Sequence, residues 1–236
     1  MLKIIVRVLG AVLFALGAVS VVLSGIDAAI HPFTPWPAFD SAGSKLVAEY
    51  SYFTLWSAII GTAVAGFYAL GHGTRSSAWA KALRLDAAMM LIVTGLVYNL
   101  IIADGSPHLG LQAYTNTINH ELLPIAMPVL WVLSMPLRTQ RDITWPTIGR
   151  ALIIPTIWVG YCLIRGTMTG FYPYDFLNVT TLGYAVALRN IAGVYALFFV
   201  LVAILGLIER VLTSRSYNPT SRRATPIAPA KIPVAH

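Results

Sequence analysis

The chain of 236 residues has little charge and almost no cysteine. Asp, Glu, Lys and Arg make up 11% of its residues, against about 25% in an ordinary soluble domain. The single cysteine, Cys162, excludes an internal disulfide and a metal centre built from several cysteines. A HExxH motif and clustered Cys and His ligands are also missing. Four of the five histidines fall in predicted loops or the tail, which disfavours a haem held by two histidines. We therefore expect no metal and no cofactor.

Apolar residues are abundant, at 57% of the sequence. A helix needs about 20 mostly apolar residues to cross a bilayer, and six stretches meet this length. The predicted spans cover residues 4–24, 51–70, 84–102, 118–136, 147–165 and 188–208. The expected fold is an all-α integral membrane bundle of six transmembrane helices.

The net charge of +7 is distributed around the apolar stretches. Thirteen of the sixteen Lys and Arg residues fall on one side of the membrane when the loops are assigned to alternate sides, and a basic bias of this kind marks the cytoplasmic side. Both termini are therefore expected in the cytoplasm, and no nucleic acid is expected as a partner. Residues 1–212 form the predicted transmembrane domain, and residues 213–236, rich in Ser, Thr, Pro and Arg, form a predicted disordered basic tail.

Polar side chains gather near the outer ends of the predicted spans. Such residues usually face the interior of a bundle, because hydrocarbon offers them no hydrogen-bond partner. The inner halves are almost free of charge, with Asp86 explained by the neighbouring Arg84. This pattern favours a cup that opens toward the outer leaflet, and it speaks against a transporter, which needs polar residues through the full depth. The polar residues at these outer ends are Asp27, Glu49, Thr54, Asn99, Asp104, Asn116, Asn119, His120, Glu121, Arg165, Arg189 and Asn190.

Thr54 is the candidate nucleophile of this cup. It shares a helical stripe with the small residues Ser57, Gly61 and Ala65, which lets a neighbouring helix approach and places Thr54 on an interior face. A hydroxyl of this kind needs a base within hydrogen-bond reach before it becomes a nucleophile. The alternative is a threonine that hydrogen-bonds to its own helix, which is common in membrane spans.

His120 is the candidate base, at about the same depth as Thr54. Pro124 lacks the amide that would bond the carbonyl of His120, so the helix is expected to open where the imidazole lies. The alternative is an interfacial histidine bonded to a carbonyl or to Glu121.

Four further residues are candidates for contact with a substrate. Asn116 and Asn119 are the nearest predicted donors for an oxyanion. Arg165 and Arg189 either pair with Asp175 and Glu121 or hold a carboxylate or phosphate group.

Three motifs resemble the bacterial Pr6Pr family of six-span membrane proteins. They are Tyr52-Phe53-Thr54-x-x-Ser57, His120-x-x-x-Pro124 and the aromatic block from Arg165 to Leu177, with Tyr172-Pro173-Tyr174 at its centre. That family in turn resembles the eukaryotic androgen-induced proteins, which hydrolyse fatty acid esters of hydroxy fatty acids with a catalytic threonine and histidine. The resemblance implies Thr54 as nucleophile, His120 as general base and a bacterial cell membrane as the location.

Two hypotheses follow. The first is a threonine-type hydrolase of lipid esters with a site facing the outer leaflet, whose partners are membrane lipid and the ester substrate. The second is a non-enzymatic lipid-binding or membrane-organising protein, in which Thr54 and His120 only hydrogen-bond a head group.

Overall fold

The structure is a computed structural model that describes residues 1–32, 37–103 and 107–213. Within these residues the secondary structure is helical throughout, and no strand occurs. The helices are α1 (Leu2–Ile30), α2 (Ala42–Glu49), α3 (Phe53–Ala69), α4 (Ala78–Val97), α5 (Gly110–Thr117), α6 (Leu123–Ser134), α7 (Trp145–Ala151), α8 (Ile153–Thr169) and α9 (Val179–Thr213). Two π-helical turns, η1 (Tyr98–Ile102) and η2 (Ile118–Leu122), and two 3-10 turns, η3 (Met135–Leu137) and η4 (Asp175–Leu177), extend or connect them.

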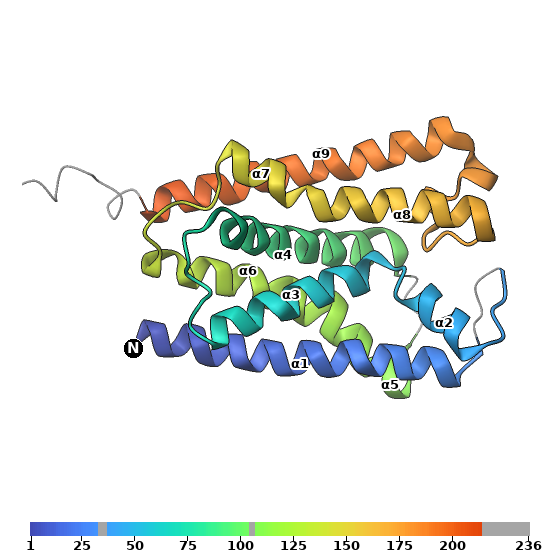
Figure 1. The fold of residues 1–236 in the computed structure, drawn as a ribbon, viewed down its shortest axis with the longest axis horizontal. Coiled ribbons are helices and arrows are strands. Elements are labelled where there is room, and N and C mark those ends of the chain that lie inside the picture. Colours follow the sequence, from blue (N-terminus) through green and yellow to red (C-terminus); the bar gives the residue numbers. More distant parts are fainter. Residues whose placement is uncertain (33–36, 104–106, 214–236) are drawn as a thin grey trace, which may run out of the picture.

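The helices pass back and forth along one axis (Figure 1). Among the described residues, five passes are long and apolar enough to cross a membrane, and α2 and α3 add a sixth if this pair, bent by 74°, counts as one span. The all-α prediction is confirmed, and every predicted span overlaps one of these passes. The chain is therefore an integral membrane protein. Thr213, the first residue of the predicted tail, is the buried last residue of α9, and residues 214–236 lie outside the described residues.

Several passes are longer than their predicted spans. α1 runs on to Ile30, and α9 begins at Val179 with a short first segment that a kink at Gly183, whose backbone is not helical (φ 72°, ψ 158°), separates from the rest of the helix. Hydropathy detects only the part of a helix that matches the hydrocarbon core, whereas a helix continues for as long as its backbone hydrogen bonds do. The sequence therefore predicts the spans better than the ends of the helices.

α4 is the central helix of the bundle. Its most apolar window is 56% buried, whereas the windows of the other four continuous passes are 22–39% buried. α1 packs closely against α3 because its glycines leave no side chain in the way: a Cβ at Gly10 would lie 2.9 Å from the carbonyl oxygen of Ala65. The small stripe predicted from Thr54 to Ala65 is buried, as expected.

The two ends of the bundle differ. We call the end where α1 begins and α9 ends the terminal end, and the opposite end, which carries α2, α5 and the α8–α9 connection, the distal end (Figure 1).

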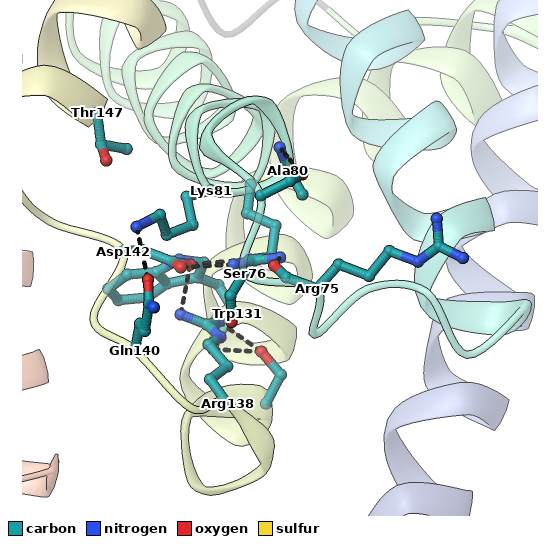
Figure 2. A network of polar contacts seen from close by, with 12 residues as sticks. Arg75, Ser76, Ala80, Lys81, Trp131, Arg138, Gln140, Asp142 and Thr147 are labelled. Carbon is teal, nitrogen blue, oxygen red and sulfur yellow. Dashed lines mark hydrogen bonds and ion pairs between the residues drawn. The ribbon is translucent and has the colours of Figure 1, made fainter. Parts of the chain in front are cut away.

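A buried ionic network lies at the terminal end, and Figure 2 shows part of it. Asp142, fully buried, accepts two hydrogen bonds from Arg84, at 2.8 and 2.5 Å, and one from Arg138, at 2.6 Å. Glu209 at the end of α9 accepts the backbone N–H groups of Asp142 and Ile143, at 2.8 and 3.0 Å. Trp131 of α6 also donates to Asp142, at 3.1 Å, so the network ties α4, α6 and α9 to the loop that follows η3.

The prediction that the neighbouring Arg84 explains the charge of Asp86 is wrong. Arg84 is 3% exposed and pairs with Asp142 instead. Asp86 is itself buried, and neither of its carboxylate oxygens has a hydrogen-bond partner among the described residues. Pairing across the bundle depends on which helices are neighbours, and spacing along one helix does not contain that information.

Candidate active site

Thr54 and His120 meet at the distal end of the bundle. Oγ1 of Thr54 lies 3.1 Å from Nε2 of His120, although the two residues are 66 positions apart. Thr54 is 8% exposed, and its hydroxyl contacts His120 and Tyr174 rather than a carbonyl of its own helix. The structure thus brings the candidate nucleophile and the candidate base within hydrogen-bond distance.

The break between α2 and α3 determines where the Thr54 hydroxyl lies. α3 begins at Phe53, so the N–H of Thr54 belongs to the first turn and has no helical carbonyl to bind. This N–H donates to the hydroxyl of Tyr174 over 3.4 Å. Ser57 fixes the same turn, because its Oγ donates to the carbonyl of Thr54 at 2.8 Å and lies 2.9 Å from Oγ1 of Thr94 on α4.

His120 lies in the π-helical turn η2, where the sequence predicted an opened helix. Pro124 has no N–H, and the carbonyl of His120 accepts a hydrogen bond from Nδ2 of Asn99 at 3.1 Å instead. π-helical turns inside longer helices are frequent at functional sites. The wider turn positions the imidazole against Thr54 without leaving its own carbonyl unpaired.

Asn116 selects the tautomer of His120. Nδ1 of the ring lies 2.8 Å from Oδ1 of Asn116, one helical turn earlier. Because an amide oxygen only accepts, Nδ1 carries the hydrogen, and in the neutral ring the unprotonated Nε2 faces Thr54. Tyr98 stacks on the imidazole with ring centroids 3.6 Å apart and an angle of 10° between the planes. Thr54, His120 and Asn116 therefore have the arrangement of a nucleophile, a base and an orienting group.

Tyr174, like Tyr98, belongs to this site although the sequence predicted no contact of either residue with Thr54 or His120. The Tyr174 hydroxyl lies 3.4 Å from Oγ1 of Thr54, and burial raises the pKa of Tyr174 from 10.0 to about 12. The residue lies in the connection between α8 and α9, in the aromatic block that the sequence analysis used only for the family resemblance. Hydropathy marks this block as a loop and contains no signal for where its side chains lie.

Two cavities meet at Thr54. A polar cavity of about 330 Å³ is lined by His120 and Asn116, and also by Asp27 and Glu49. A mostly apolar cavity extends from Thr54 between α4, α8 and α9. Thr54, Tyr98, Ile102 and Tyr174 line both cavities. The hydroxyl of the candidate nucleophile thus lies where a polar space and an apolar space join.

The remaining predicted site residues lie around this centre or apart from it. Asn119 lines the polar cavity and is 3% exposed, and its Oδ1 accepts a hydrogen bond from Ser20 of α1 at 3.0 Å. Arg165 lies over the rings of Phe39 and Phe171, at 5.4 and 4.7 Å from their centroids. Its Nη1 is buried and has no hydrogen-bond partner in the part of the chain that the structure describes.

Neither Arg165 nor Arg189 lines the two cavities. Arg189 is exposed on α9. Among the described residues, neither arginine forms an ion pair with Asp175 or Glu121. The contact of these arginines with a substrate, like the oxyanion role of Asn116 and Asn119, stays a prediction.

Over the part of the chain that the structure covers, no three His, Cys, Asp or Glu side chains gather as metal ligands would. Comparison of the chain with protein-family models, with curated proteins and with solved structures gave no match.

Proposed function

We propose that this chain is a membrane-embedded, threonine-type hydrolase of lipid esters. The observation that carries the proposal is the contact of Thr54 Oγ1 with Nε2 of His120 at 3.1 Å, with Asn116 on Nδ1 of the same ring. A hydroxyl, a base and a group that orients the base are the parts that acyl transfer through a covalent intermediate requires.

The first half of the reaction transfers the acyl group to Thr54. Oγ1 of Thr54 attacks the ester carbon while its proton moves to Nε2 of His120. The bond between the carbon and the alcohol oxygen then breaks, and the leaving alcohol takes the proton back from His120. In the second half, water attacks the acyl carbon and gives a proton to His120, which returns it to Oγ1 of Thr54 as the fatty acid leaves.

The two cavities support an ester with one long apolar part. The acyl chain occupies the apolar cavity beside Val97 and Ile191, and water and the alcohol enter through the polar cavity. Asp27 and Glu49 line the polar cavity, so it suits a neutral alcohol better than an anionic one. Esters of hydroxy fatty acids fit this arrangement when the carboxylate lies away from these two residues.

The motifs of Thr54, His120 and the aromatic block support the same reaction through their resemblance to the Pr6Pr family and the androgen-induced hydrolases. The basic bias of the loops supports cytoplasmic termini. With that orientation the distal end faces the outer leaflet, and substrate enters sideways from the membrane of a bacterial cell.

The second candidate function is lipid binding without turnover. The apolar cavity favours it, because a bound acyl chain needs no reaction there. In that case Thr54 and His120 hydrogen-bond a head group, and no product is released.

Labelling by a fluorophosphonate tests the proposal. The purified protein in detergent should be labelled at Thr54 and should cleave fatty-acid esters. Thr54→Ala and His120→Ala should lose both activities by more than about a thousandfold, as when a nucleophile or base is removed from a hydrolase. Thr54→Ser should keep labelling, since it keeps the hydroxyl.

The matched control is Thr62→Ala, which removes a second buried threonine of α3 that lies outside both cavities. Thr62→Ala should be labelled by the fluorophosphonate and should cleave esters at the parental rates. A folded parent that neither labels nor cleaves any ester, yet retains lipid through purification, would favour the lipid-binding function.

A further inference from the structure

Tyr174 contacts the candidate nucleophile through two hydrogen bonds. Its hydroxyl accepts the N–H of Thr54 and lies within reach of Oγ1 of the same residue, at 3.4 Å in both cases. We propose that Tyr174 is a further catalytic residue of the proposed hydrolase, an inference that rests on that function. The hydroxyl of Tyr174 and the N–H of Thr54 together bind the oxyanion of the tetrahedral intermediate.

The reaction requires donors at this place. When Oγ1 of Thr54 bonds to the ester carbon, the carbonyl π pair moves onto the oxygen, which becomes an oxyanion next to the nucleophile. Donors fixed there in advance supply a large part of the rate enhancement in acyl transfer. Tyr174 and the N–H of Thr54 supply two hydrogens that reach this point.

The side-chain amides of the predicted donors, Asn116 and Asn119, are each oriented by a contact of the amide oxygen with a residue other than Thr54. Oδ1 of Asn116 binds the imidazole on the side away from Thr54, and Oδ1 of Asn119 binds Ser20. Tyr174 contacts Thr54 itself. Its position is therefore the better one for an oxygen that is bonded to the carbon under attack.

Tyr174 also lies where the ester group must lie. It lines both the apolar and the polar cavity, as Thr54 does. With the acyl chain in the first space and the alcohol in the second, the carbonyl of the ester falls between Thr54 and Tyr174. The hydroxyl of Tyr174 thus faces the reacting group and not the chain.

The ring of Tyr174 is held by aromatic neighbours. Phe176 stacks on it at 5.3 Å, and Tyr52 and Trp158 meet it edge-on at 5.5 and 6.1 Å between centroids. A donor held in this way needs little reorganisation when the oxyanion forms, which is the condition under which such donors are effective.

The resting contacts of Tyr174 are easily exchanged. At 3.4 Å they are longer than the usual 2.7–3.2 Å of a good hydrogen bond. When the ester binds, its carbonyl oxygen takes the place of these contacts and accepts hydrogen bonds from the O–H of Tyr174 and the N–H of Thr54. The Tyr174 proton is donated as a hydrogen bond and is not transferred, so the proton path between Thr54, His120 and the leaving alcohol is unchanged.

The protonation state of Tyr174 agrees with this role. Burial raises the pKa of Tyr174 to about 12, so the phenol keeps its hydrogen at any pH where the protein is handled.

The test compares Tyr174→Phe with Tyr161→Phe. Tyr161 of α8 lines neither cavity, and its hydroxyl lies 2.8 Å from Oγ of Ser51, away from Thr54. Tyr174→Phe should lower kcat for a fatty-acid ester by about a hundredfold with KM changed by less than about threefold, because the lost bond forms mainly in the transition state. Tyr161→Phe should leave both constants near the parental values.

A second measurement does not depend on the folding of the Phe variant. Replacement of Tyr174 by 3,5-difluorotyrosine keeps the ring and the hydroxyl but makes the phenol more acidic. If the O–H is the donor, the alkaline limb of kcat should move to lower pH than in the parent.

The outcomes separate the two proposals. A folded Tyr174→Phe protein with parental kcat, or an alkaline limb unmoved by fluorination, overturns the role of Tyr174 while the hydrolase stands if Thr54→Ala is inactive. A folded parent that labels at no residue and cleaves no ester overturns the hydrolase and this inference with it.

Discussion

The side-chain amide of Asn99 donates a hydrogen bond to the backbone carbonyl of His120 over 3.1 Å. The same amide also donates to the carbonyl of Gly95 at 2.9 Å. Gly95 lets the helices approach here, because a Cβ on it would lie 2.7 Å from Cβ of Pro124. Asn99 and Gly95 lie in the pass formed by α4 and η1. Asn99 supplies the donor that Pro124 lacks, Gly95 leaves room for the Pro124 ring, and together they hold the turn that carries the imidazole.

Asn99→Ala should therefore weaken the site without abolishing it. The variant leaves the carbonyl of His120 without its donor, and a hydrogen bond of this kind contributes about 1 kcal/mol. If the loss falls on the orientation of the imidazole, the rate of fluorophosphonate labelling falls roughly fivefold. Leu100→Ala, at the exposed neighbouring position, is the control and should label like the parent. Equal rates for the two variants would contradict a positioning role for Asn99.

The sequence predicts the fold of this chain well because length and hydropathy decide which segments cross a membrane. It also places Thr54 and His120 at one depth, since both stand near the outer ends of their spans. It does not predict that Tyr174 reaches Thr54, because the loop between α8 and α9 has no periodicity from which to read its path. The pairing of Arg84 with Asp142 is hidden for a similar reason: it depends on lateral neighbours 58 residues apart.

Asn116 should be replaceable by a residue that keeps its acceptor. Asn116→Ala removes the partner of Nδ1 of His120, so the ring is free to rotate or to place its hydrogen on Nε2. A loss of about 10- to 100-fold in kcat is expected, less than when an aspartate is removed from a triad. Asn116→Asp keeps an acceptor oxygen and should retain most of the activity. A pair of variants with the same kcat would show that the contact at 2.8 Å has no influence on the base.

The apolar cavity should set the length of the acyl chain. Val194 of α9 lines it beside Ile191 and Phe198, and Val194→Trp fills part of the space. The variant should lose about tenfold in kcat/KM for long-chain esters and keep its rate for acetyl and butyryl esters, since a pocket discriminates by about 1–3 kcal/mol per methylene. The control is Val200→Trp on the same helix, where the side chain is 56% exposed. If both chain lengths are affected equally, the acyl chain lies elsewhere.

The pH dependence should reflect the pKa of Tyr174. This pKa lies at about 12 instead of 10.0 because the phenol is buried, and the neutral form is the one that donates. Because the raised pKa moves the ionisation of Tyr174 to higher pH, the labelling rate should stay constant up to about pH 10, where an exposed tyrosine begins to lose its proton. The stability that burial of the neutral phenol contributes is likewise complete below pH 10 and lost as the pH rises toward 12. Labelling rates between about pH 7 and 11, corrected with Thr54→Ala, test this; a loss of half the rate near pH 8 would contradict it.

The ionic network at the terminal end should determine stability and not activity. Asp142 is fully buried between Arg84 and Arg138, and Asp142→Asn removes the charge that both guanidinium groups share. Breaking a buried pair in this way costs about 3–5 kcal/mol, because the remaining charge is left in a medium that solvates it poorly. The variant should unfold at a temperature lower by several degrees in detergent, whereas the folded fraction should label at the parental rate, since Thr54 lies at the opposite end of the bundle.

Asp175→Asn, at an exposed position, provides the matched control and should leave the melting temperature unchanged. A parental melting temperature for Asp142→Asn would mean that the two arginines find other partners, and a selective loss of labelling would mean that the two ends of the bundle are coupled.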